Sequence, residues 1–455
     1  MSENYLATRY TCSWPWQIGV LLCDGRMVCG CADPYAKRVL GDARTSSIAG
    51  IWTGPVASQL RAEINQGGSS FCGDCPLKLP LGKDEAPPQR DLTVNAIPGR
   101  LYIECTAACN ISCNQAVCAP ETGITRTRQA GMLDFDLFTK VIDEAGPSLG
   151  RIDFFNYGEA FLHKRAVEMC EYIKTKFPHI YLYTSTNGLA FTEEKVRQLA
   201  RSGIDEVTFS LDGASQETYV QYRQRGNFDK AIANLRALLD ERAKMGRHSP
   251  FVNWRYILFK WNDSDEEMNK ARAMATELGI DRLCWEITDH PEDSFSRRFA
   301  PGTPDYERIR YEIWDNSGLG NAIPGATPRA EIDVHTVLPD LPFMTRTSTP
   351  VSLTAHVKNL SSRPFRAHSD QGDGRRVIRL GAQLTDANGV VISRDYARAW
   401  LPVDLGPGRS AEVRIDVAAP ETPGRYGLKF DLVSEGIDWF ESCGSPTITR
   451  GLWVS

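Results

Sequence analysis

The stretch from Cys105 to Cys118 constrains this chain more than any other part of it. It reads CTAACNISCNQAVC and holds four thiols within fourteen residues, directly after a short apolar segment at residues 101–103. Because so tight a loop brings several sulfurs to a common point, this spacing is typical of cysteines that bind one soft metal centre. The alternative, a set of buried or disulfide-linked cysteines, is disfavoured because most pairwise bridges in such a loop would be strained.

Most of the cysteines are clustered, and the composition predicts the cellular compartment in which they function. Of the thirteen, six lie in residues 12–75 and four in residues 105–118, while Cys170, Cys284 and Cys443 stand apart as ordinary core residues. The 455 residues are 42% hydrophobic and 24% charged with a net charge of -5, which predicts a globular protein of two or three domains without a nucleic-acid partner. No run of eighteen apolar residues and no signal-peptide core occurs, so we expect a cytoplasmic protein without a membrane span. In a cytoplasmic protein, clustered cysteines favour metal or iron–sulfur ligation over disulfide bonds.

Strand and helix patterns alternate through residues 95–300. The candidate strands are 101–104, 152–156, 180–184, 206–211, 253–259 and 282–287, with amphipathic helical stretches between them. Six β/α units at this spacing predict a parallel sheet, either curled into a partial barrel or doubly wound. In such folds the chemistry lies at the carboxyl ends of the strands. The residues expected at that edge are the cysteine loop, Gly158-Glu159, Asn187-Gly188 and Asp212-Gly213.

These ordered segments resemble the radical SAM superfamily. IECTAACNISC is similar to the family's cluster loop, NYGEAFLH to its GGE motif, STNG to its third strand end, and FSLDGASQETYVQYRQRGNFDKAIANL to its fourth unit. The resemblance implies a partial (β/α)6 barrel in which three cysteines hold a 4Fe–4S cluster and leave one iron open to S-adenosylmethionine. It further implies reductive cleavage of S-adenosylmethionine to a 5′-deoxyadenosyl radical, which abstracts a hydrogen atom from a substrate.

Two cysteine triads fit the cluster loop. The spacing allows Cys105, Cys109 and Cys113, or Cys109, Cys113 and Cys118. In the family the strand leads into E-P-T-x-x-C-N, which places Cys105 at the proline and Cys109 at the first ligand. The resemblance therefore favours Cys109, Cys113 and Cys118, whose CxxxCxxxxC spacing departs from the usual CxxxCxxC.

The resemblance also implies residues that bind the methionine part of S-adenosylmethionine. Gly158 would let the backbone approach the methionine end closely, although Tyr157 replaces the first glycine of GGE. Glu159 would accept the ammonium group, directly or as a strut for the loop. Arg223 is the expected partner of the carboxylate, with Arg225 as the second choice.

Further residues are expected near the nucleoside and the substrate. Ser210 and Asp212 end the fourth strand, where ribose contacts normally lie in the family, and Val117 would pack on adenine. For the polar residues the alternative is structural, because turn residues and surface ion pairs look the same in sequence. Substrate contact and ordinary loop placement are both open for Lys260, Trp261, Trp285, Glu286 and His290.

Residues 1–90 carry a second cysteine pattern. An Asp24-Gly25 hairpin turn would bring Cys29 or Cys31 near Cys12, and Cys72 and Cys75 could complete a four-thiolate site, with Cys23 left out. The order is similar to SPASM or twitch-type domains of radical SAM enzymes, and other matching residues are Leu40-Gly41-Asp42, Ile51-Trp52 and Leu60-Arg61. The resemblance implies one auxiliary 4Fe–4S cluster, although a structural zinc would satisfy the same thiols. Unlike the usual arrangement, this domain precedes the catalytic core.

The last part of the chain changes to alternating apolar residues. After a stretch rich in Pro, Gly and Arg, such patterns occur at 351–357, 377–384, 390–392, 411–417 and 427–433. They predict an immunoglobulin-like β-sandwich in which Tyr426 acts as a corner tyrosine. Similar domains accompany polysaccharide and cell-envelope enzymes, so glycan recognition is one hypothesis, and a packing or dimerisation module is the other.

The predicted organisation is therefore a SPASM-like domain (1–90), a radical SAM partial barrel (95–300) and a β-sandwich (325–455). The expected function is a radical SAM enzyme that modifies a carbohydrate or glycan-linked substrate by hydrogen abstraction. The alternatives are the same chemistry on a ribosomal peptide, and a non-catalytic binding protein stabilised by iron–sulfur or zinc. The expected partners are a small-molecule, glycan or peptide substrate and an electron donor such as flavodoxin or ferredoxin.

Overall fold

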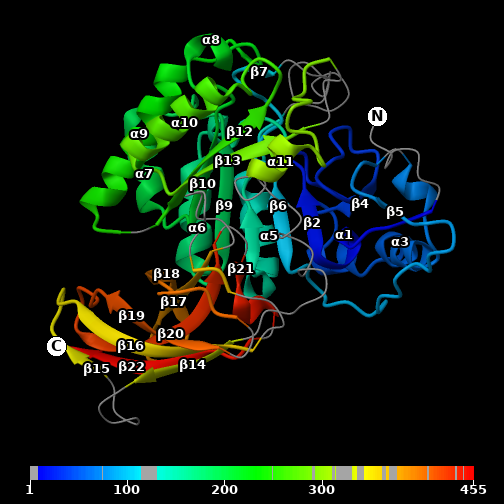
Figure 1. Ribbon diagram of the computed structural model, residues 1–455. Helices are drawn as coiled ribbons and strands as arrows, with labels where there is room; N and C mark the ends of the chain where they lie inside the picture. Colours follow the sequence, from blue (N-terminus) through cyan, green and yellow to red (C-terminus); the bar gives the residue numbers. More distant parts are fainter. Residues whose placement is uncertain are drawn as a thin grey trace. The chain divides into compact units, whose positions relative to one another are not determined.

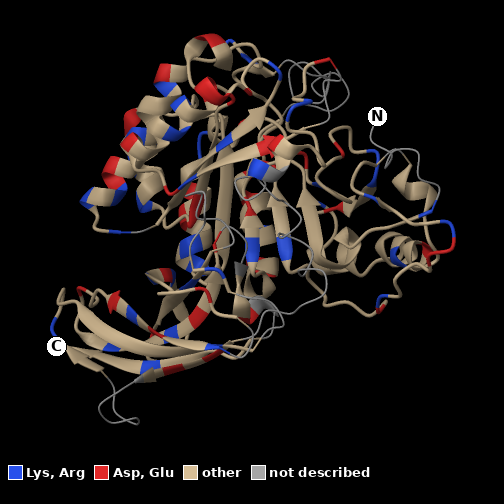
Figure 2. Ribbon diagram, viewed as in Figure 1, with Lys and Arg blue, Asp and Glu red and all other residues tan. Residues whose placement is uncertain are grey.

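The computed structural model describes residues 9–455 except 74, 114–130, 248, 289–292, 310–312, 314–329, 336–342, 361–364, 368–376, 407–408, 436–437 and 444. The chain divides into two compact units, Met1–Met245 with Pro250–Thr303 and Gly246–Ser249 with Pro304–Ser455. Among the described residues, no helix combines the length and the apolar character that a membrane span requires. Basic and acidic side chains are interspersed along the helices of the first unit (Figure 2).

Six parallel strands form most of the central sheet of the first unit (Figure 1). In order they are β6 (Arg100–Ile103), β8 (Arg151–Asp153), β9 (Tyr181–Thr186), β10 (Glu206–Ser210), β12 (Phe251–Leu258) and β13 (Arg282–Ile287). Each is parallel to its neighbour, and neighbours follow chain order. This order has no topological switch point, which excludes the doubly wound alternative. It is the order that six successive β/α units of a partial barrel require.

Helices connect these strands, and most of them begin at a residue whose side chain caps the helix. The helices are α5 (Phe135–Ala145), α6 (Ala166–Lys176), α7 (Glu193–Arg201), α8 (Gln216–Tyr219), α9 (Phe228–Lys244) and α10 (Asp265–Leu278). The side chains of Asp134, Thr192, Asn227 and Ser264 each accept a hydrogen bond from the backbone three residues later. Such caps satisfy amide groups that a helix start leaves unpaired. The strands combine fully buried apolar residues such as Ile152 and Val207 with buried polar ones such as Asp153 and Asn253.

The N-terminal segment extends the same sheet. Strand β2 (Ile18–Leu21) pairs in parallel with β6, and β3 (Arg26–Val28) and β4 (Val39–Asp42) follow in antiparallel register. The turn between β2 and β3 contains Gly25 at φ +90°, which confirms the predicted hairpin. The other elements of the segment are α1 (Trp14–Gln17), α2 (Ile48–Trp52), α3 (Pro55–Asn65), β1 (Tyr10–Thr11) and β5 (Leu79–Pro80). Strands β2, β3 and β4 thus share one sheet with the central segment, whereas β1 and β5 pair separately, and the domain boundaries remain a prediction.

The second unit consists of two β-sheets around one core (Figure 1). One sheet contains β14 (Ala330–His335), β16 (Val351–Asn359) and β19 (Ser410–Val417). The other contains β15 (Phe343–Thr345), β22 (Ile448–Val454), β20 (Gly424–Ser434), β17 (Ile378–Thr385) and β18 (Val391–Trp400), with β21 (Asp438–Trp439) beside β20. A helix, α11 (Pro304–Ile309), also belongs to this unit.

The alternating residues of these strands meet in the shared core. Val357 of β16 and Phe430 of β20, for example, are fully buried in one apolar cluster. The Tyr426 hydroxyl donates a hydrogen bond to the backbone oxygen of Thr422 (2.9 Å), as a corner tyrosine does. The β-rich character of the segment is confirmed, whereas an immunoglobulin-like topology is not and remains a prediction.

Candidate functional site

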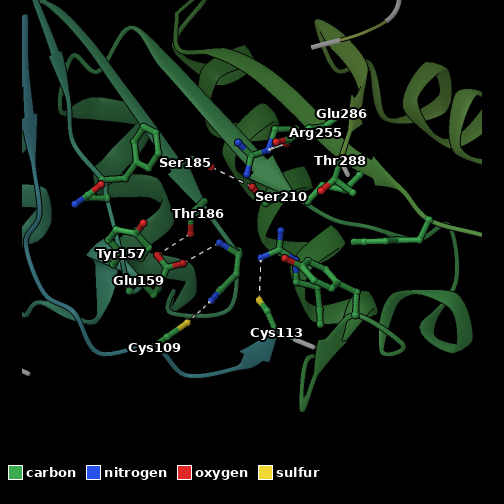
Figure 3. A pocket seen from close by; sticks show the side chains of 18 residues that line it. Cys109, Cys113, Tyr157, Glu159, Ser185, Thr186, Ser210, Arg255, Glu286 and Thr288 are labelled. Carbon is green, nitrogen blue, oxygen red and sulfur yellow. Dashed lines mark hydrogen bonds and ion pairs between the residues drawn. The ribbon is translucent and has the colours of Figure 1, made fainter. Parts of the chain in front are cut away.

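A cavity of about 280 Å³ lies at the carboxyl ends of the parallel strands in the first unit (Figure 3). Its wall combines the cluster loop after β6, the loop after β8, and the ends of β9, β10, β12 and β13. These segments are far apart in the sequence, and the sheet brings them together. The cavity therefore occupies the edge at which the sequence predicts the chemistry.

Two cysteines of the cluster loop form part of this wall. Cys109 and Cys113 line the cavity, whereas Cys105 is 1% exposed and lies outside the wall. Burial raises the pKa of the Cys109 thiol, and it raises that of Cys105 far more. A bound metal centre stabilises the thiolate form and would therefore oppose this rise in the pKa of Cys109. The placement supports the triad that omits Cys105, but Cys118 and Val117 lie outside the described residues.

A short ribbon holds Cys113 against Arg223. Strand β7 (Ser112–Cys113) pairs with β11 (Arg223–Gln224) so that Arg223 lies opposite Cys113. The Arg223 side chain lines the cavity, and its Nη1 donates to Cys113 Sγ at 3.5 Å. Its Nε donates to the Asp212 carboxylate at 2.5 Å, so the guanidinium has a fixed orientation. An anionic ligand group beside the cysteines would meet this cation.

Glu159 serves as a buried strut. Its carboxylate accepts hydrogen bonds from the Thr186 hydroxyl and the Asn187 backbone amide, both at 2.8 Å, and it is 2% exposed. Burial raises the pKa of Glu159, and the hydrogen bonds from Asn187 and Thr186 oppose that rise. The carboxylate thus ties the loop after β8 to the end of β9. Contact with the methionine ammonium remains a prediction.

Gly158 lets two loops approach each other at their backbones. It has φ +79°, and a Cβ atom there would lie 2.4 Å from the Thr106 oxygen and 2.6 Å from the Ala108 oxygen. The neighbouring amide of Glu159 donates to the Ala108 oxygen at 2.8 Å. The close approach observed at this glycine is to the cluster loop, and its approach to the methionine end remains a prediction.

Of the other predicted cofactor residues, one lines the cavity and two lie outside its wall. Ser210 lines the cavity, with its hydroxyl 3.0 Å from that of Ser185. Asp212 is completely buried outside the wall, where it accepts from Arg223 and from the Ile257 amide. Asp212 therefore orients Arg223, and its predicted contact with the ribose remains a prediction. Arg225 does not line the cavity and donates to the Ser112 hydroxyl.

Two residues of the cavity make contacts that the sequence analysis did not predict. The Asn187 amide donates to Asn110 Oδ1 at 2.8 Å and to Cys109 Sγ at 3.7 Å, so it links the third strand to the cluster loop. Arg255 of β12 forms an ion pair with Glu286 of β13 (Nε–Oε2 3.0 Å) on the cavity wall (Figure 3). The STNG motif and an arginine inside an otherwise apolar strand were the available signals.

The remaining candidates near strands five and six do not line the cavity. Trp285 is fully buried, Trp261 stacks on Phe259, and the Lys260 ammonium donates to the Asp293 oxygen. His290 lies outside the described residues. Of that predicted group, Glu286 is the one in the cavity wall.

The N-terminal cysteines form a second group of buried thiols. Burial raises the pKa of Cys29, and the next largest contributions come from the thiols of Cys12, Cys72 and Cys75. Burial also raises the pKa of Cys31, to about 12, but its main charged neighbours are Arg100 and Asp153. Cys31 packs instead against the apolar cluster around Val20 and Tyr102. Among the described residues, no three metal-binding side chains converge tightly enough for a single ion.

This arrangement fits a four-cysteine cluster site. Four thiols in a largely apolar setting are the donor set that an iron–sulfur cluster uses. The neighbours of Cys29 and Cys31 favour Cys29 as the ligand beside Cys12, Cys72 and Cys75. We propose this set, with Cys29 rather than Cys31 as the fourth ligand.

Several known proteins are similar to parts of this chain. A cofactor-modifying protein of the tungsten-containing aldehyde ferredoxin oxidoreductase from Pyrococcus furiosus is 28% identical over 40% of this chain and 49% of its own length. The GTP 3′,8-cyclase of Desulforamulus reducens is 28% identical over 31% and 42%, and mycofactocin maturase MftC of Mycolicibacterium smegmatis is 32% identical over 30% and 33%. The chain thus spans half or less of the length of these relatives.

Solved structures are similar at a lower level. SuiB of Streptococcus suis bound to S-adenosylmethionine has a TM-score of 0.33 and 16% identity, over 42% of this chain and 40% of that chain. The enzyme anSMEcpe with bound AdoMet has a TM-score of 0.32 and 19% identity, over 41% and 50%.

Two family models match the chain where the sequence motifs lie. Residues 103–270 match the radical SAM superfamily, and residues 12–76 match the SPASM iron–sulfur cluster-binding domain. The predicted family, the position of the SPASM region and the cofactors that both imply are thereby confirmed. This chain belongs to the radical SAM superfamily and carries a SPASM iron–sulfur cluster-binding domain at its N-terminal end.

Proposed function

We propose that this chain is an enzyme that cleaves S-adenosylmethionine reductively and modifies a substrate by hydrogen abstraction. The observation that carries the proposal is the placement of Cys109, Cys113 and Arg223 around one cavity at the carboxyl ends of six parallel strands. When bound, the cluster and S-adenosylmethionine supply the electron transfer and the 5′-deoxyadenosyl radical. The protein supplies the positions and the shielding.

Each cavity residue has a role in this proposal. Cys109, Cys113 and, from sequence alone, Cys118 hold the iron–sulfur cluster. Arg223, oriented by Asp212, pairs with the methionine carboxylate. Asn187 donates toward the Cys109 sulfur, which stabilises its thiolate form. The aromatic residues Phe155, Tyr157, Tyr222 and Phe259 line the cavity and limit the water that reaches it.

The opposite part of the wall suits a polar substrate. Arg255 and Glu286 present both charges of an ion pair to the cavity, and Thr288 adds a hydroxyl. A substrate rich in hydroxyl groups can accept from the arginine and donate to the carboxylate. Together with the β-rich second unit, this favours a carbohydrate or glycan-linked substrate over a ribosomal peptide. Flavodoxin or ferredoxin is the proposed electron donor.

Anaerobic reconstitution of the full chain tests the activity. About eight irons per chain are expected, four for each of two clusters. Adding dithionite and S-adenosylmethionine should yield 5′-deoxyadenosine, measured by chromatography. A fully loaded protein that forms none would favour the non-catalytic binding protein instead.

Two single variants test the cysteine triad. Cys118→Ala should abolish 5′-deoxyadenosine formation and remove one cluster, whereas Cys105→Ala should retain both clusters. The reverse result would assign Cys105 as the third ligand. Oligosaccharides that speed up 5′-deoxyadenosine formation would support the glycan proposal, and a response to peptides alone would reject it.

A further inference from the structure

Arg61 of helix α3 is buried completely, although its guanidinium group carries a charge. Its Nε donates to the Pro15 oxygen at 2.7 Å and its Nη2 donates to the Trp52 oxygen at 2.9 Å. The guanidinium also lies 4.7 Å from the centre of the Trp52 ring. These neutral contacts fix the side chain but do not neutralise it.

No carboxylate among the described residues forms an ion pair with this guanidinium. Its Nη1 is buried and has no hydrogen-bond partner in the described part of the chain. Burial lowers the pKa of Arg61, and the charged group that opposes this is the Cys29 thiolate. An arginine stays protonated even when buried, and an unpaired buried cation is strongly destabilising. Within the described residues, this positive charge therefore has no negative partner.

Other buried arginines of the same unit have carboxylate partners. Arg100 pairs with Asp153, and Arg223 pairs with Asp212. Arg38, which also acts on the thiols of Cys29 and Cys72, lies 3.7 Å from Asp33. Arg61 differs because its contacts within the described residues are neutral, and one of them, the Pro15 oxygen, lies three residues after the proposed ligand Cys12. Its partner is thus expected among the ligands of the cluster.

We infer that Arg61 is the counter-ion of the auxiliary iron–sulfur cluster and raises its reduction potential. A 4Fe–4S core with four thiolates is negatively charged, and reduction adds one more negative charge. A buried cation stabilises the reduced form more than the oxidised form, because the attraction grows with the charge and little water screens it. The free N–H of Nη1 can also donate toward a sulfur, which acts in the same direction. The inference rests on the SPASM domain and not on the proposed catalysis.

The test uses the full chain with Cys109→Ala and Cys113→Ala, so that only the auxiliary cluster contributes to the spectrum. The protein is loaded anaerobically with iron and sulfide, and the potential is measured by redox titration monitored by EPR. Arg61→Met removes the charge and keeps an unbranched stem. We expect the reduction equilibrium to become at least tenfold less favourable, a shift of about 59 mV to lower potential for a one-electron couple. Arg61→Lys should retain most of the wild-type potential.

Arg44→Met is the matched control. Arg44 belongs to the same domain but is exposed and already pairs with Asp42 at 2.5 Å. Its removal should leave the potential unchanged. A loaded Arg61→Met protein with four irons and the wild-type potential would overturn the inference. So would an equal shift in Arg44→Met, because it would reflect net charge alone.

Two further measurements cover other outcomes. Asp74 lies outside the described residues, so the Arg61→Met comparison is repeated on Asp74→Asn, where the shift should persist. Its loss there would make Asp74 the partner of Arg61 and reject the inference. Should Arg61→Met not fold, pulsed EPR answers the question on protein that carries both Arg38→Lys and Arg90→Lys and is labelled with 15N-arginine, because those two arginines also act on the thiols. A 15N coupling to the reduced cluster supports Arg61, and its absence rejects it.

Discussion

Gly158 is the residue at which the two loops of the cavity touch. Gly158→Ala would require a positive φ, and its methyl group would collide with two backbone oxygens of the cluster loop. The left-handed conformation alone costs about 1–3 kcal/mol, and backbone atoms cannot move aside as a flexible side chain can. We therefore expect Gly158→Ala to lower the free energy of unfolding by at least about 3 kcal/mol. The iron content of the protein should fall as well. Urea unfolding and iron analysis measure both.

Gly279 provides the control for this effect. It ends helix α10 at φ +68°, and a Cβ atom there would meet nothing within 4 Å. Gly279→Ala should therefore cost only the conformational part, about 1 kcal/mol. Equal losses for the two variants would show that the approach of the loops at Gly158 has no energetic importance.

Asp431 makes the stability of the β-rich unit depend on pH. Burial raises the pKa of this carboxyl to about 7, and the nearby Glu441 carboxylate raises it further, against the Glu441 amide that donates to it. Because the folded pKa exceeds the unfolded one, the folded state binds more protons between pH 4 and pH 7. The free energy of unfolding should therefore fall as pH rises through this window, by up to about 4 kcal/mol.

Pulsed hydrogen exchange during urea unfolding can follow β20 at each pH. The Asp431→Asn variant should lose most of the pH dependence, since an amide does not titrate in this window. A slope in Asp431→Asn as steep as in the wild type would assign the effect to another group.

At the scale of secondary structure, the β7–β11 ribbon positions two residues of the cavity wall. It pairs Cys113 with Arg223, and Asp212 at the end of β10 holds Arg223 from behind. Asp212→Ala leaves this arginine buried without its carboxylate, which typically costs about 3–5 kcal/mol. We expect that loss in urea unfolding, together with weaker binding of S-adenosylmethionine measured by calorimetry.

The double variant Asp212→Ala with Arg223→Met separates charge from packing. It should recover part of the stability, because no unpaired charge remains, but not the binding of S-adenosylmethionine. The exposed pair Arg236–Glu277 serves as the control, and its removal should cost less than about 1 kcal/mol. A double variant as unstable as Asp212→Ala would contradict this view of the ion pair.

Sequence patterns predicted the elements better than the contacts between them. The six strands, the helix starts and the motif residues at the carboxyl edge follow from local periodicity and ordered motifs, so they could be predicted. The burial of Asp212 behind Arg223 could not be predicted, because it depends on how segments distant in the sequence pack against each other. The choice between Cys29 and Cys31 likewise depends on the direction of each side chain, which spacing of two residues does not reveal.

In the first unit as a whole, strands of the SPASM region and the strands that carry the cavity belong to one continuous sheet. Strand β2 pairs with β6 along four residues, and its Val20 and Leu21 are fully buried. A fragment of residues 95–455 would expose that edge of β6 and the apolar side chains that β2 covers. We expect this fragment to aggregate and to bind no cluster in the cavity, although its cysteine loop is intact.

Solubility, circular dichroism and iron content of the fragment test this dependence. A chain that ends at Thr303 is the control, because it leaves the sheet of the first unit complete and removes most of the second unit. It should remain folded and load iron. If residues 95–455 instead fold and bind one cluster, the SPASM region is an independent domain and the pairing of β2 with β6 contributes little. If they do not, the SPASM region lies in the same cooperative unit as the cavity, because removing β2, β3 and β4 from the sheet then unfolds the strands that carry the cavity.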